Sequence, residues 1–312
     1  MTTPTADRTD ASRQKSLQKS LWLAAIKPPM YSVAVIPILV GSLLARVETG
    51  QLDSRILAIF LLSAVLLLVW ENLSNDVYDA DTGIDKNKHH SLVNLTDNQS
   101  LIFWLGNLSL ALGVGGVVAI ALIQQDITVV GLILLCCTLG YLYQGPPFRL
   151  GYQGLGEPLC FISFGLGVGA AYYAQAQTFS RSCWALAAIV GMATTLVLFC
   201  SHFHQVSDDL AAGKRSPIVR LGTQGGARLL PWLCSSIFVI LLGGLLGGVL
   251  PVGSALALAS APFAIQLCRH VQRYHDRPQL VEDAKFVAIR FQFLCGTLLC
   301  LGLLLPLPLG TA

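Results

Sequence analysis

The chain has 312 residues, of which 12% are charged and 54% are hydrophobic, and its mean hydropathy is +0.64. Soluble globular proteins contain about 25% charged residues, so this composition excludes a soluble protein of this size. The net charge of +3 is spread over several short segments instead of one basic stripe, so it gives no indication of nucleic-acid binding, and we expect no nucleic-acid partner. The composition therefore predicts an all-α protein that crosses a membrane several times.

Runs of about 20 mostly apolar residues, enough for a helix to cross ~30 Å of hydrocarbon, occur nine times in the sequence. The polar segment 1–20 has no apolar signal sequence, so we expect a polar tail followed by one transmembrane domain over 21–312. The predicted helices, of which the fourth is short, span 22–45, 56–75, 101–123, 127–143, 158–177, 183–203, 228–249, 251–268 and 286–306.

Lys and Arg are distributed unequally between the two ends of these helices. Seventeen of the 20 lie in the N-terminal segment and in the connections after the second, fourth, sixth and eighth helices. The other connections contain only Arg46, Arg55 and Arg181. Cytoplasmic connections are enriched in Lys and Arg, so we expect a cytoplasmic N-terminus and a C-terminus across the membrane. All six His and most carboxylates belong to the same end, which places the expected active site at the cytoplasmic face.

The segment WENLSNDVYDADTGIDKNKHH, residues 70–90, places polar side chains at the end of the second helix. Asn72, Asp76 and Asp79 share a helix face because they are spaced by four and three residues. Clustered carboxylates at a membrane boundary repel one another unless a cation neutralises them, and Mg²⁺ binds carboxylates together with substrate phosphates. The segment predicts a Mg²⁺ site, and a solvated acidic loop is the alternative. The candidate metal ligands here are Asn75, Asp76, Asp79 and Asp85.

The segment SHFHQVSDDLAAGKRSPIVRLG, residues 201–222, is a second acidic cluster. Ser201, Gln205 and Asp209 are spaced by four residues, so we expect them on one face of a continuing helix that Gly213 ends. Two acidic clusters at one end of a bundle, each followed by Lys or Arg, favour a Mg²⁺-bridged diphosphate over a simple ion-pair network. The candidate metal ligands here are Gln205, Asp208 and Asp209.

The segment YLYQGPPFRLGYQGLGEP, residues 141–158, ends the fourth helix with a Pro- and Gly-rich loop. Its Tyr and Phe side chains could belong to an aromatic belt at the membrane boundary. Alternatively, they line a pocket for an aromatic or cationic intermediate. Lys27, which precedes two prolines in the first helix, either extends to the interface or points into the same cavity.

These three segments together resemble the UbiA superfamily of intramembrane aromatic prenyltransferases, over most of the chain and including the nine-helix count. The superfamily motif NxxxDxxxD matches Asn75 and Asp79, whereas Gly83 stands at the third acidic position. The resulting NDxxDxxxGxD form and the GPPFRLGYQGLGE loop resemble the MenA branch, which acts on 1,4-dihydroxy-2-naphthoate.

The second family motif departs from the usual pattern. Of its two aspartates four residues apart, only Asp209 is matched, because the first position is Gln205. The usual Asn-rich stretch is replaced by His202, Phe203 and His204, a form that resembles cyanobacterial and plastid members. The departure leaves two options for the metal: Asp208 with Asp209, or one carboxylate with Gln205.

The resemblance implies an enzyme that uses Mg²⁺ to transfer a prenyl chain, with phytyl as the expected chain, from its diphosphate. The implied acceptor is 1,4-dihydroxy-2-naphthoate or 2-carboxy-1,4-naphthoquinone, with loss of CO₂ and diphosphate, in phylloquinone or menaquinone biosynthesis. We expect a bacterial plasma membrane or a thylakoid, surrounding lipid and no obligate protein partner. The expected catalytic residues are Asn75, Asp79, Arg149, Asp209 and Lys214. The expected substrate-binding residues are Lys27, Asn72, Lys86, Tyr143, Arg149, His202, His204, Lys214 and Arg215.

Three other functions remain to be weighed. A prenyltransferase of this superfamily could instead use homogentisate or 4-hydroxybenzoate as its acceptor. A transporter would place ionisable residues near the bilayer midplane, whereas here they gather at one boundary. A membrane di-iron hydroxylase needs clusters such as HxxxH and HxxHH, whereas this sequence contains only HxH and HH.

Overall fold

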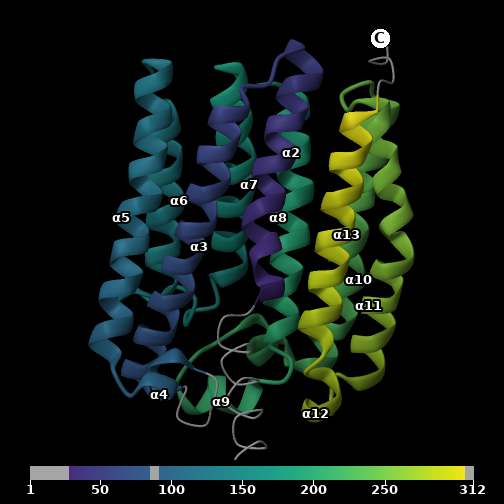
Figure 1. The fold of residues 1–312 in the computed structure, drawn as a ribbon. Helices are drawn as coiled ribbons and strands as arrows, with labels where there is room; N and C mark the ends of the chain where they lie inside the picture. The colour runs from purple at the N-terminus through teal and green to yellow at the C-terminus, as the bar shows by residue number, and fades with distance from the viewer. Residues whose placement is uncertain (1–27, 85–90, 306–312) are drawn as a thin grey trace, which may run out of the picture.

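The computed structural model describes residues 28–84 and 91–305, and every regular element in these ranges is helical (Figure 1). Its helices run side by side as one bundle, with the chain crossing from end to end. The elements are η1 (Pro28–Tyr31), α2 (Ser32–Thr49), α3 (Ser54–Thr82), α4 (Leu92–Thr96), α5 (Gln99–Gln124), α6 (Thr128–Gln144), α7 (Gly156–Ala176), α8 (Arg181–Ser201), α9 (Val206–Ala211), α10 (Pro217–Leu246), η2 (Val252–Ser260), α11 (Ala261–Tyr274), α12 (Pro278–Val281) and α13 (Ala284–Leu304).

Eight helical segments in the described ranges are long and apolar enough to cross a membrane, and α6 is a shorter apolar helix of 17 residues. With η2 and α11 counted as one segment, these nine correspond one to one to the nine predicted helices. The chain is therefore an integral membrane protein, and the predicted helical class is confirmed. Residues 22–27, the start of the first predicted helix, lie outside the described residues.

At the end where the polar segments lie, the bounds of two helices differ most from the prediction. The second predicted helix ends at residue 75, but α3 continues to Thr82, where Gly83 with φ 73° donates its N–H to Asp79 O and Ala80 O. The seventh predicted helix begins at residue 228, but α10 begins at Pro217 and bends at Gly222. Both additions are polar helical turns beyond the apolar run, which hydropathy alone does not detect.

The centre of the bundle depends on close contact between helix backbones. A Cβ at Gly41 of α2 would lie 2.3 Å from Val168 O and 2.9 Å from Tyr172 N of α7, so no larger residue fits there. Small residues allow such approach between helices in lipid, where apolar side chains gain little by association. Helix α8 is the most enclosed span, with 72% of its apolar window buried. These contacts fix the positions of the helices that carry the polar segments.

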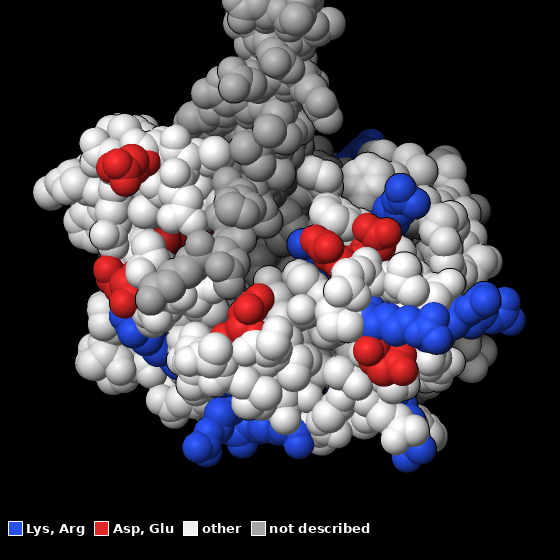
Figure 2. Space-filling view, turned by 90° about the horizontal axis from the view of Figure 1, so that it is seen from below, with Lys and Arg blue, Asp and Glu red and all other residues white. Residues whose placement is uncertain are grey.

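The lower end of the bundle in Figure 1 carries the short helices α4, α9 and α12. Seen end-on in Figure 2, its described surface presents acidic and basic side chains interspersed among neutral ones. The polar segments identified in the sequence meet at this end, and α13 ends at the opposite end. The predicted gathering of charged residues at one end is therefore confirmed for the described residues.

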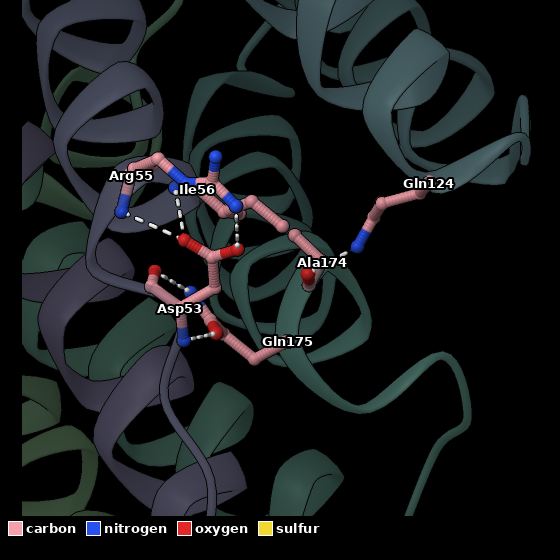
Figure 3. Close-up of polar contacts among 6 residues, drawn as sticks. All are labelled: Asp53, Arg55, Ile56, Gln124, Ala174 and Gln175. Carbon is pink, nitrogen blue, oxygen red and sulfur yellow. Dashed lines mark hydrogen bonds and ion pairs between the residues drawn. The ribbon is translucent and has the colours of Figure 1, made fainter.

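The opposite end has short connections that polar contacts hold in place (Figure 3). The Asp53 side chain caps α3 by accepting from the N–H groups of Ile56 and Arg55, and these bonds hold its pKa below the ordinary value. Gln175 exchanges two hydrogen bonds with the Asp53 backbone, at 2.9 and 3.1 Å, and so ties α7 to the start of α3. Gln124 donates to Ala174 O and attaches the end of α5 to the same helix.

The unequal distribution of Lys and Arg predicts which end faces the cytoplasm. In a cysteine-depleted background, single cysteines at positions 88 and 215 should be labelled from the cytoplasmic side, and one at position 125 from the other side. Position 125 ends α5 at the upper end and position 215 follows α9 at the lower end, whereas position 88 lies outside the described residues. Labelling of 88 and 215 from opposite sides would contradict this topology.

Candidate active site

Among the described residues, Asp209 of α9 is the most enclosed carboxylate at the lower end, with a side-chain exposure of 1%. Its Oδ1 lies 3.4 Å from Lys214 Nζ, and its Oδ2 lies 3.3 Å from His202 Nδ1. His202 Nε2 lies 3.5 Å from Glu157 Oε1 at the start of α7. The second acidic segment is therefore built around one buried carboxylate with a Lys and a His as neighbours.

The electrostatics of Asp209 follow from these contacts. Burial raises its pKa, but the hydrogen bond from His202 and the positive charge of Lys214 outweigh that effect and leave the pKa below its ordinary value. The Lys214 N–H also donates to Asp209 O at 2.7 Å, so backbone and side chain both hold the lysine in place. Asp209 is therefore a carboxylate at neutral pH.

The prediction of one continuous helix face through Ser201, Gln205 and Asp209 is wrong. Helix α8 ends at Ser201, and α9 begins after Gln205. Gln205 and Asp209 remain one turn apart, since Asp209 N–H donates to Gln205 O at 2.8 Å. The break turns His202 inward, where its exposure is 2%.

The first acidic segment lies on the last turns of α3, as expected. Asp76 is buried, and its Oδ2 accepts from Leu92 N–H at 2.9 Å, which attaches the start of α4 to α3. Asp79 Oδ1 accepts from the Tyr152 hydroxyl at 2.9 Å. Tyr152 therefore brings the loop between α6 and α7 onto this motif.

Tyr152 also contacts the second acidic segment. Lys214 Nζ lies 5.7 Å from the centre of its ring, in cation–π geometry, and Arg215 N–H donates to Tyr152 O at 2.7 Å. The contacts Asp79–Tyr152–Lys214–Asp209 therefore join the two acidic segments through one aromatic residue. Burial, and next the Asp79 carboxylate, raise the pKa of Tyr152, so its hydroxyl keeps the proton that it donates.

Tyr152→Phe should lower turnover by about 10-fold or more, since a hydrogen bond to a charged group contributes ~1.5–3 kcal/mol. The substitution removes the donor to Asp79 but keeps the ring below Lys214. The matched control is Tyr173→Phe, because Tyr173 donates to Asp126 Oδ2 at 2.7 Å at the opposite end of the bundle. Steady-state kinetics on both variants check this, and equal turnover of the two would contradict a role for the Tyr152 hydroxyl.

The other predicted residues are distributed unevenly around this centre. Asn72 Nδ2 and Arg149 Nε are buried and make no hydrogen bond to the described residues. Tyr143 is half-buried, and its ring lies against Gly151 and Gly156. The half-buried members are Asn75, His204 and Gln205, and the exposed ones are Asp208 and Arg215. Lys27, Asp85 and Lys86 lie outside the described residues.

The donor atoms at this end fit a hard divalent cation. The candidate ligands are carboxylate and amide oxygens, the atoms that Mg²⁺ prefers. Within the described ranges, no three His, Cys, Asp or Glu side chains converge on one point. Asp76 and Asp79 on α3 and Asp209 on α9 supply such oxygens from the two acidic segments.

Sequence reasoning missed two residues of this centre, Tyr152 and Glu157. Both belong to segment 141–158, and their contacts reach residues about 70 and 45 positions away in the chain. One signal points to Tyr152: it follows Arg149 by three residues in a loop that Pro and Gly restrict. Nothing in the sequence alone pairs Glu157 with His202.

Comparison with known proteins gives consistent results. The UbiA prenyltransferase family matches residues 34–307. The 2-carboxy-1,4-naphthoquinone phytyltransferase of Synechocystis is 52% identical over 91% of this chain and 93% of its own length. The chloroplastic enzyme of that name from Arabidopsis thaliana is 42% identical over 92% of this chain and 77% of its own length.

A solved structure supports the fold. A UbiA homologue from Archaeoglobus fulgidus bound to DMAPP and Mg²⁺ has a TM-score of 0.61 and 13% identity, covering 88% of this chain and 99% of that chain. At this identity the likeness concerns the fold alone. The match over residues 34–307, the two acidic segments on one bundle and the identity to the two phytyltransferases lead to one conclusion: this chain belongs to the UbiA prenyltransferase family.

Proposed function

We propose that this prenyltransferase joins a phytyl chain, taken from phytyl diphosphate, to 1,4-dihydroxy-2-naphthoate in the pathway to phylloquinone or menaquinone. The observation that carries the proposal is the contact series Asp79–Tyr152–Lys214–Asp209 at one end of a membrane bundle. It combines acidic groups for a metal with a cation for phosphate. The names of the Synechocystis and Arabidopsis relatives support the phytyl chain and an acceptor of this class, since they name 2-carboxy-1,4-naphthoquinone, the oxidised form of 1,4-dihydroxy-2-naphthoate.

The metal in this proposal is Mg²⁺, and the residues that would hold it are Asn75, Asp76, Asp79, Gln205, Asp208 and Asp209, with Asp85 outside the described residues. When bound, Mg²⁺ supplies positive charge that neutralises the diphosphate and stabilises it as a leaving group. A homologue bound to DMAPP and Mg²⁺ supports a divalent metal in this family.

The chain's own groups have distinct tasks in this mechanism. Lys214 and Arg215 supply positive charge to the phosphate oxygens. Arg149 Nε, buried without a hydrogen bond to the described residues, would gain an acceptor from the same diphosphate. Tyr152 holds Asp79 in place through its hydroxyl. The helix bundle excludes water from the allylic carbon while the C–O bond to diphosphate breaks.

Atoms and electrons balance in the transfer step. The allylic carbon of the donor forms a bond to the ring carbon that bears the carboxylate, and diphosphate leaves with the electron pair of the broken C–O bond. The carboxylate leaves as CO₂, and its bonding pair returns to the ring, so the product is a prenylated hydroquinone. The hydrocarbon tail extends into lipid, consistent with a bacterial plasma membrane or a thylakoid as the location.

One assay tests the proposal. Purified protein with Mg²⁺ is given a panel of prenyl diphosphates and three acceptors: 1,4-dihydroxy-2-naphthoate, homogentisate and 4-hydroxybenzoate. We expect mass spectrometry to find decarboxylated, phytylated naphthohydroquinone and release of inorganic diphosphate only with the metal. Preference for a single-ring acceptor, or release of no diphosphate, would contradict the proposal.

A further inference from the structure

Glu71 is an ionisable residue inside a membrane-spanning helix, where such groups are costly and mark functional positions. Within the described residues its carboxylate makes no hydrogen bond or ion pair, and its backbone O, besides its place in α3, accepts from Gln144 Nε2 at 3.1 Å. It lies two turns before Asp79 on α3, which places it about 12 Å deeper in the membrane at 1.5 Å per residue. The mechanism above does not use it.

The orientation of Glu71 follows from its helix and its neighbours. Residues 71, 75 and 79 follow one another at four-residue spacing, so Glu71 continues the polar face that carries Asn75 and Asp79. Its Oε2 faces Gly140 of α6 so closely that a Cβ there would lie 2.5 Å away. The carboxylate therefore occupies space between α3 and α6 that exists only because residue 140 is glycine.

Two tyrosine side chains lie near this position. The Glu71 carboxylate interacts electrostatically with the hydroxyl groups of Tyr78 on α3 and Tyr143 on α6. The carboxylates of Asp79 and Glu157 also interact with the Tyr143 hydroxyl. The Tyr78 ring meets the Tyr141 ring edge-on at 6.2 Å. The surroundings thus combine aromatic rings, which suit a flat aromatic molecule, with a carboxylate, which suits a hydroxyl donor.

We propose that Glu71 binds the aromatic acceptor by accepting a hydrogen bond from a ring hydroxyl. The proposal rests on the proposed function above, since it needs a dihydroxynaphthoate acceptor. In that molecule the 1-hydroxyl neighbours the carboxylate and bonds to it internally, so the 4-hydroxyl is the one left for the protein. Depth also fits: the diphosphate belongs near Asp79 at the boundary, and the apolar acceptor belongs deeper in the bundle.

The test compares Glu71→Met, which keeps the length of the side chain but cannot accept this bond, with Glu71→Gln, whose amide oxygen still can. We expect Glu71→Met to raise the acceptor KM by about 10- to 100-fold, Glu71→Gln to raise it less, and the donor KM to stay unchanged. With 1-hydroxy-2-naphthoate, which lacks the 4-hydroxyl, the wild type and Glu71→Met should have the same acceptor KM. The reason is that a site built to bind a hydroxyl gains nothing from that contact when the analogue lacks the hydroxyl.

Gly140→Ala supplies a second, independent variant, because the new Cβ displaces the flexible end of Glu71 and leaves its charge in place. It should raise the acceptor KM alone but have no further effect in the Glu71→Met background, since coupled residues are non-additive. Glu48→Gln is the control: this carboxylate accepts from the Tyr172 hydroxyl near the end of α2, away from the site.

An unchanged acceptor KM in Glu71→Met would overturn the proposal. An equal rise in KM for 1,4-dihydroxy-2-naphthoate and for 1-hydroxy-2-naphthoate would overturn it as well. A fall in thermal stability without a change in acceptor KM would assign Glu71 a structural role and overturn it too. Failure of this proposal can be distinguished from failure of the proposed function, because wild-type turnover with the dihydroxynaphthoate is measured first. Its absence contradicts the function, whereas normal wild-type turnover with an unaffected Glu71→Met contradicts the role of Glu71 alone.

Discussion

Asp79→Asn and Asp209→Asn should each lower turnover by about 10²–10³-fold, the usual cost of removing one stabiliser of developing charge. Asn keeps the size of Asp and one acceptor oxygen, so Tyr152 can still donate to residue 79 and packing is retained. What disappears is the negative charge that would hold the metal beside the diphosphate. The expected loss of turnover therefore concerns the chemical step, and Asp209→Asn should in addition lower stability because Lys214 loses its ion-pair partner.

The double variant Asp79→Asn/Asp209→Asn tests whether the two segments act as one site. Residues that act as a unit are strongly non-additive, so the double variant should be little worse than either single variant. Turnover across a Mg²⁺ titration, with thermal stability in parallel, measures this. Asp81→Asn is the control, because Asp81 is an exposed carboxylate of the same helix that binds Gln99 Nε2 at 2.7 Å. Near-normal turnover in either single variant would refute a shared site.

Hydropathy predicted the helices well because lipid leaves a long apolar run no other stable state. It predicted their polar ends poorly, because hydropathy detects only the apolar run and not the polar helical turns that continue it. The last two turns of α3 contain Asp76 and Asp79, and the first turns of α10 contain Arg220, so both lie outside any apolar window. Glycine marks the ends more reliably: Gly213, which is predicted to end a helix, and Gly83, which follows α3, adopt positive φ angles of 71° and 73°.

The site was predictable in part. The helical spacing of Asp76 and Asp79 and the fixed loop around Arg149 are local features, and local features can be read from sequence. The inward position of His202 depends on the break between α8 and α9. Residues 202–205 contain no Gly or Pro that would predict this break. The bridge through Tyr152 depends on tertiary contacts between segments far apart in the chain, so only the structure reveals it.

Lys214→Met should lower the free energy of unfolding by about 3 kcal/mol, since removing one partner of a buried ion pair typically costs 3–5 kcal/mol. The side-chain exposures are 11% for Lys214 and 1% for Asp209, so the remaining carboxylate would be left in a largely dry site. The lower end of the range applies because His202 stays 3.3 Å from Asp209 Oδ2. Turnover should fall as well, because a phosphate-binding charge is lost.

Adding Asp209→Asn to Lys214→Met separates stability from activity. The neutral amide no longer needs the ammonium, so the double variant should recover most of the lost free energy of unfolding while its turnover stays low. Denaturant titration in detergent measures the first quantity and prenyl transfer the second.

The control is Arg55→Met, which removes an exposed ion pair. Arg55 lies 3.6 Å from Asp53, and the side-chain exposures are 81% and 34%. Such surface pairs contribute only ~0–1 kcal/mol, so this variant should be nearly as stable as the wild type. If Lys214→Met were equally stable, or if Asp209→Asn failed to restore it, the buried pair would not be what holds α9 in place.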